Sequence, residues 1–143
     1  MKLKDFDFRI WNNNAKKYES ECIIDALGFV ESVFKQLTYE NETINYELEL
    51  WTRLYDKNDK KIYEGDIIRY PTINSSNFLY YVVLINPEIN VFELFRATMD
   101  LEKNKLLDIS KIDRLSLYLF KNINKKEERE IIGNIHQNED LLK

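Results

Sequence analysis

Alternation of apolar and polar residues with a period of two runs through much of the chain and limits it to a mainly β fold. The clearest run spans residues 44–55, where mostly apolar side chains occupy every second position. A polar turn at 56–60 and a short apolar run at 61–63 follow it. Residues 44–63 therefore predict a β-hairpin.

Further strands are predicted where short apolar runs lie between turn signals, at residues 6–11, 67–70, 78–85, 91–99, 115–120 and 130–136. The run 78–85 is apolar on both faces, which indicates a central strand or a strand covered by a partner subunit. Because interspersed acids interrupt the basic run that ends at Arg129, residues 122–129 are interpreted as a solvated loop.

Three segments are less clear. Residues 22–37 fit a helix or two short strands, and their β-branched and aromatic content around Gly28 favours strands. Residues 101–113 read as a loop with a helical turn. Residues 139–142 read as a short terminal helix, which Asn138 can cap.

Gly65 stands between two acids in the stretch Glu64-Gly65-Asp66. Two carboxylates could form a general acid–base pair, but these are only two residues apart and no pocket is implied around them. We instead expect Gly65 to adopt a left-handed backbone and the Asp66 side chain to accept hydrogen bonds from turn amides. The stretch is interpreted as a corner of the fold.

Composition excludes several classes of protein. The 44% hydrophobic content is typical of a globular domain, and the net charge of −4 argues against a dedicated nucleic-acid binder. The single cysteine, Cys22, permits no internal disulfide and favours a reducing compartment. No apolar signal segment opens the sequence, and its longest apolar run is too short to span a bilayer, so we expect a soluble, cytoplasmic protein.

Catalytic and metal-binding patterns are missing from the sequence. One histidine and one cysteine cannot build a His/Cys zinc site, and no phosphate-binding glycine motif occurs. His136 lies in a predicted strand without the context of a nucleophile, so it is interpreted as a partly exposed strand residue. We expect no enzyme activity, no metal and no cofactor.

Arginines placed next to aromatic residues are the candidate ligand-binding groups. An arginine beside an aromatic ring can stack on a base and pair with a phosphate. The alternative is a surface cation–π pair, or an aromatic buried against a second layer or another subunit. Period-two alternation puts Arg9 and Trp11 on one face of a strand, and it puts Trp51, Arg53 and Tyr55 on one face of another strand. The candidate ligand-binding residues are Arg9, Trp11, Trp51, Arg53, Tyr55 and Arg69.

Three segments resemble the YopX family, small proteins encoded mainly by phages and prophages of Gram-positive bacteria. Residues 8–11 (FRIW) are similar to the family's FRAWD, and residues 51–68 to YTGLKDKNGKEIYEGDIV. Residues 131–142 are similar to VIGNIYENPELL. This chain departs from the pattern at Arg53 and Asp59, where the family has glycine, and at His136, where it has an aromatic residue.

The resemblance implies a mainly β protein with a small barrel-like core that self-associates, and it implies no catalytic residues. We therefore expect a single SH3-like or barrel-like domain over residues 1–143, assembled as a homo-oligomer in the cytoplasm of the infected or lysogenic host. The expected function is a phage counter-defence sponge that sequesters a nucleotide second messenger. The alternative is a protein- or nucleic-acid-interaction module; a host protein is a further expected partner, and a membrane is not.

If the arginine and aromatic residues hold the ligand, Arg53→Ala and Trp11→Ala should each abolish binding. We expect both substitutions to leave thermal stability nearly unchanged, because both residues are predicted on ligand-facing strand surfaces.

Overall fold

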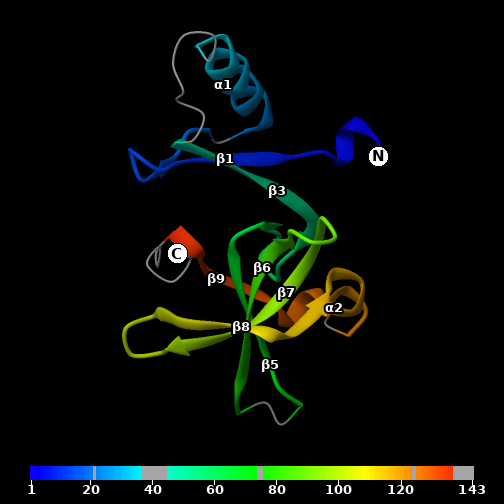
Figure 1. The fold of residues 1–143 in the computed structure, drawn as a ribbon. Coiled ribbons are helices and arrows are strands. Elements are labelled where there is room, and N and C mark those ends of the chain that lie inside the picture. Colours follow the sequence, from blue (N-terminus) through cyan, green and yellow to red (C-terminus); the bar gives the residue numbers. More distant parts are fainter. Residues whose placement is uncertain (21, 37–44, 74–75, 124, 137–143) are drawn as a thin grey trace. The chain divides into compact units, whose positions relative to one another are not determined.

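The computed structural model describes residues 1–20, 22–36, 45–73, 76–123 and 125–136. The chain forms two compact units, residues 1–51 and residues 52–143. Strand β3 (Tyr46–Tyr55) begins in the first unit and ends in the second. Each unit is therefore described by itself (Figure 1).

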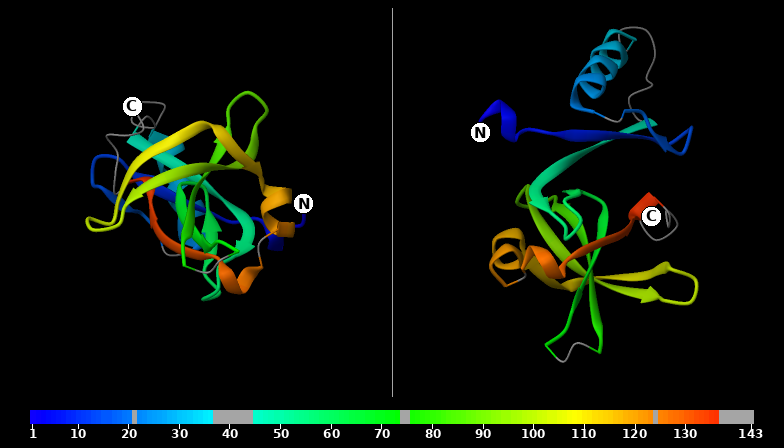
Figure 2. Two further views of the ribbon diagram at one scale, coloured as in Figure 1. Left: turned by 90° about the horizontal axis from the view of Figure 1, so that it is seen from below. Right: turned by 180° about the vertical axis from the view of Figure 1, so that it is seen from behind.

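The first unit is a small antiparallel sheet with one helix. It contains η1 (Leu3–Asp5), β1 (Phe8–Asn12), β2 (Lys17–Tyr18), α1 (Ile23–Gln36) and the first part of β3, and its strand order is β2-β1-β3. Both Figure 1 and Figure 2 show α1 along one side of β1. The buried centre of this unit consists of Phe8, Ile10 and Ala26.

Helix α1 overturns the prediction of strands over residues 22–37. Ala26 belongs to this core, and three further apolar residues of the helix pack on it: Ile23, Phe29 and Val30. Val33, seven residues after Ala26, is buried as well. This spacing is that of one helix face, and its burial against β1 outweighs the β propensity of the individual residues.

The second unit contains a five-stranded antiparallel sheet of order β8-β7-β6-β5-β9 (Figure 2). Its strands are β5 (Asp66–Pro71), β6 (Phe78–Asn86), β7 (Val91–Asp100), β8 (Lys105–Ser116) and β9 (Glu130–Asn134). The C-terminal part of β3 pairs with β4 (Lys61–Tyr63), which confirms the hairpin predicted at 44–63 within its described residues. The mainly β fold is thus confirmed.

Two predictions in the second unit are wrong. Residues 105–116 are strand β8, not a loop, and residues 117–123 are helix α2 (Leu117–Ile123), not a strand. Ser116 Oγ accepts a hydrogen bond from the Leu119 N–H and so caps α2, while Phe120 is fully buried. The 3-10 helix η3 (Lys126–Glu128) follows, and the predicted helix 139–142 lies outside the described residues.

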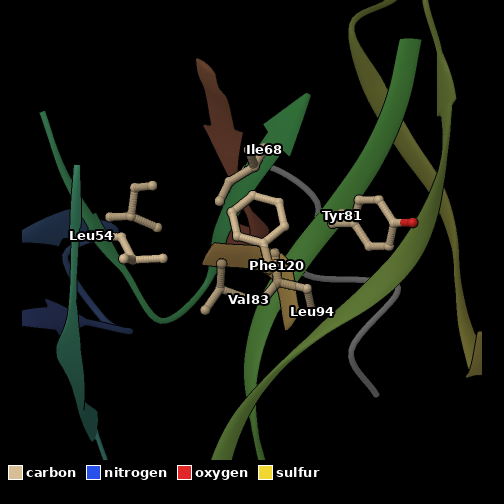
Figure 3. Packing of buried hydrophobic residues seen from close by; sticks show 7 residues of the cluster. Leu54, Ile68, Tyr81, Val83, Leu94 and Phe120 are labelled. Atoms are coloured by element: carbon tan, nitrogen blue, oxygen red, sulfur yellow. The ribbon is translucent and has the colours of Figure 1, made fainter. Parts of the chain in front are cut away.

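Strand β6 is the central strand that its doubly apolar sequence predicts. Neighbouring residues face two different cores, since Val82 packs in a cluster with Ile67 whereas Val83 packs in a cluster with Ile68. Figure 3 shows Phe120 among Ile68, Val83 and Leu94 in the second of these clusters. Because this unit itself covers both faces of β6, a partner subunit is not needed to explain the apolar pattern.

Gly65 forms the predicted corner. Its φ is 85°, the left-handed conformation that glycine adopts without a steric penalty. Asp66 Oδ2 accepts a hydrogen bond of 2.8 Å from the Tyr63 N–H across the turn. The Gly65 N–H donates to the Val83 carbonyl, and the Gly65 carbonyl accepts from the Ile135 N–H, so the corner joins β6 to the end of β9.

Within the described residues, none of the helices combines the length and the apolar character that crossing a membrane requires.

Candidate functional site

Arg69 is held in a fixed position at the junction of three strands of the second unit. Its Nε and Nη2 donate to the same oxygen of Glu130, at 2.9 and 2.7 Å, across the β5–β9 pairing. Its guanidinium carbon lies 4.7 Å from the ring centroid of Phe78 on β6. The arginine is therefore oriented by a carboxylate at its edge and by an aromatic ring at its face.

A second cation reaches the same carboxylate. Lys57 Nζ, from the turn after β3, lies 3.1 Å from the Glu130 oxygen that Arg69 contacts. The side chains of Lys57 and Arg69 are both more than a third exposed, and Phe78 is exposed. Two cations around one carboxylate leave a local surplus of positive charge beside an accessible aromatic ring.

The hydrogen bond from Arg69 lowers the pKa of Glu130, and Lys57 adds to the effect, against a smaller opposing contribution from burial. Glu130 is thus ionised at neutral pH and keeps both cations in place. Arg69 has five N–H donors, of which this carboxylate uses two, so its other donors can serve an anionic ligand.

Arg9 and Trp11 lie together on the first unit, as predicted, but in a closed cluster. Arg9 Nε lies 2.5 Å from Glu49 Oε2, and the guanidinium lies 4.6 Å from the centroid of Tyr18. The Tyr18 hydroxyl donates to Glu49, and the Tyr18 ring packs edge-on against Trp11. Since Trp11 is only 7% exposed, we no longer expect Trp11→Ala to leave stability unchanged.

Strand β3 is irregular at Arg53, whose φ of 67° is left-handed. Arg53 and Tyr55 flank the buried Leu54 in the second unit, whereas Trp51 is the last residue of the first unit. Lys126 Nζ lies 5.9 Å from the ring centroid of Tyr55. Arg53 itself is exposed.

Arg129 contradicts the prediction that its segment is solvated. Its side chain is buried, Nε donates to the Tyr55 carbonyl at 2.7 Å, and the guanidinium lies over the ring of Phe120. Within the described part of the chain, its Nη1 has no hydrogen-bond partner. Burial lowers the pKa of Arg129, and the nearby charges of Glu127 and Asp56 oppose this shift.

An apolar groove that the sequence did not predict lies on the first unit. Its volume is about 230 Å³, and it opens between α1 and the strands β1 and β3. The residues that line it are Ile10, Phe29, Val30, Val33, Phe34, Tyr46, Glu47 and Leu48. It was missed because the sequence interpretation placed strands, and so no helix, over residues 22–37.

Tyr18, Glu49, Lys57, Phe78 and Glu130 were also missed as partners of the candidate arginines. Only one signal was available in advance, the acidic residues within the predicted strands 44–55 and 130–136, and the local pattern alone does not tell which strands pair.

A family model described as YopX protein matches residues 7–143, which include all three segments that carry the resemblance. No curated protein matches the chain significantly.

Proposed function

Since the chain belongs to the YopX family, as its three motifs predicted, we propose that it is a phage-encoded, non-enzymatic binding protein that holds a nucleotide-derived anion at Arg69. One observation carries the proposal: Arg69 is fixed by Glu130 and stacked on the exposed ring of Phe78, with Lys57 beside it. A function in counter-defence would follow from sequestering a nucleotide second messenger of the host.

The chemistry of this site suits a nucleotide better than a simple anion. A phosphate can accept hydrogen bonds from the remaining donors of Arg69 and from Lys57. A base can stack on the open face of the guanidinium or on Phe78, and base–aromatic stacking contributes about 1–3 kcal/mol. The other predicted arginine cluster fits less well, because Arg9 is largely buried and paired with Glu49.

Native mass spectrometry of the full chain with a panel of cyclic nucleotides and ADP-ribose derivatives tests the proposal. We expect at least one member of the panel to be retained at micromolar concentration. Arg69→Gln should weaken that binding at least about tenfold, because it removes a charge-assisted contact.

Arg96→Gln is the matched control, since Arg96 also lies over an aromatic ring, Tyr81, on the same sheet. It removes the same charge and should leave the affinity unchanged. Retention of no panel member, or equal losses in the two variants, would contradict the proposal. Salt-dependent retention of DNA or RNA would favour the interaction-module alternative instead.

A further inference from the structure

Helix α1 carries more apolar surface than its own unit covers. One face, which includes Ala26, Phe29 and Val30, packs on the core of the first unit. On the flank of this face, Ile24, Leu27 and Phe34 are 76%, 50% and 64% exposed. Three large apolar side chains exposed on one helix flank indicate a surface for another molecule.

The spacing on this flank is that of a helix–helix seam. Ile24, Leu27, Glu31 and Phe34 follow one another in steps of three, four and three residues. This is the a/d pattern of a heptad repeat, and a narrow seam of this kind fits a partner helix with the same spacing. A second copy of α1 supplies that helix.

The seam matches itself when two copies run antiparallel. In antiparallel pairs an a position packs opposite a d position of the other helix. Ile24 then lies opposite Phe34 of the second copy, and Leu27 lies opposite Glu31 of the second copy. The two-fold axis of a self-complementary interface generates the other two layers, in which Glu31 lies opposite Leu27 and Phe34 lies opposite Ile24 of the second copy.

Charge selects the antiparallel direction. A parallel pair would put Glu31 directly opposite Glu31 of the second copy, whereas the antiparallel pair puts it opposite Leu27. Glu31 is also neutralised within its own helix by Lys35, whose Nζ lies 2.8 Å from its carboxylate. Antiparallel helices in addition align their dipoles favourably.

Gly28 lies beside the seam, near the centre of this register. Nothing lies within 4 Å of the position that a Cβ would occupy there, so the unit's own packing does not require a glycine. Glycine inside a helix costs about 0.5–1 kcal/mol relative to alanine. At a helix crossing, however, it lets two backbones approach closely.

From these observations we propose that α1 is a homodimer contact, in which two copies pack antiparallel through Ile24, Leu27, Glu31 and Phe34. This surface does not include Arg69, so the dimer proposal and the ligand proposal can be tested independently of each other. It also gives the expected self-association a place other than β6, whose two faces are already covered.

Analytical ultracentrifugation of the full chain from about 1 to about 500 µM tests the contact by mass action. The mass should rise from that of the 17.3-kDa monomer to twice that value. Leu27→Glu should weaken association at least about tenfold, because it faces Glu31 of the second copy. Leu27→Lys should retain association, because the introduced lysine faces the same glutamate.

Leu107→Glu is the matched control, since Leu107 on β8 is 48% exposed, close to the value for Leu27.

Gly28→Gln should raise the melting temperature of the monomer through its better helix propensity and yet weaken the dimer. A chain that stays monomeric throughout would overturn the proposal. So would loss of association in both Leu27 variants, which indicates a parallel pair, or an equal loss in the control.

Discussion

Asp56 Oδ2 accepts a hydrogen bond of 3.2 Å from the backbone N–H of Ile131, which is 75 residues away in sequence. Oδ1 of the same carboxylate accepts from the N–H groups of Asn58 and Lys60, at 2.8 and 3.0 Å. One fully buried side chain therefore closes the turn after β3 and fastens β9 to it. The second and third segments of the family resemblance meet at this residue.

Removing the Asp56 carboxylate should destabilise the protein strongly. Asp56→Ala leaves three backbone donors without their acceptor and takes away a charge near the buried Arg129, so we expect a loss of about 3 kcal/mol in the free energy of unfolding. Urea unfolding followed by circular dichroism measures it. Asp59→Asn, in the same turn but exposed, is the control and should change stability by less than about 0.5 kcal/mol. A comparable loss in both variants would contradict the role assigned to Asp56.

The departures of this chain from the family glycines predict a stabilising substitution. Arg53 and Asp59 both stand where the family has glycine, and both have left-handed backbones, with φ of 67° and 61°. Because a side chain is strained in this conformation, Arg53→Gly should stabilise the chain by about 0.5–1 kcal/mol. Thermal unfolding measures the gain. Lys111→Gly is the control, because Lys111 is an exposed cation on β8 that is not among the positive-φ residues, and this substitution should destabilise the chain. A loss of stability in Arg53→Gly as well would contradict the strain argument.

The parts of the fold that the sequence predicts correctly are those decided by neighbours in sequence. The hairpin at 44–63 follows from alternation and turn chemistry, and the corner at Gly65 follows from the backbone freedom of glycine. Helix α1 was missed because its residues favour strands individually, and only the packing of Ala26, Phe29 and Val30 on the core residues of β1 decides the outcome.

The candidate site was predicted only in part for the same reason. Arg69 was named from its place in a strand, but its partners Glu130 and Phe78 depend on how β5 pairs with β9 and β6. Strand order is a non-local property, because a partner 61 residues away leaves no mark on the local pattern. The buried position of Arg129 likewise depends on the ring of Phe120 and the Tyr55 carbonyl, which are distant in sequence.

Trp11 should behave as a core residue, contrary to its predicted place on an exposed binding face. Trp11→Ala removes a large buried side chain that packs against Tyr18, so we expect a loss of about 3 kcal/mol in the free energy of unfolding. Trp51→Ala is the control, since Trp51 is only partly buried and should cost less. Urea unfolding measures both losses, and equal losses for the two variants would contradict the assignment of Trp11 to the core.

Glu130 should make stability depend on pH in the acid range. Its pKa in the folded protein lies below the ordinary value of 4.5, chiefly because Arg69 donates to its charged form. The unfolded chain therefore binds the proton more readily, so this contribution is fully present above the ordinary pKa and is lost as the pH falls through the folded pKa. Carbon-detected NMR titration of the Glu130 carboxyl should give a midpoint below 4.5.

Arg69→Gln should move that midpoint up toward 4.5, and Lys57→Gln should move it less, because Arg69 is the larger cause of the shift. The acid loss of stability, compared at about pH 7 and about pH 3, should shrink in Arg69→Gln accordingly. If the Glu130 midpoint were the same in the wild type and in both variants, the two cations would not be what holds this carboxylate ionised, and the charge arrangement on which the ligand proposal rests would have to be abandoned.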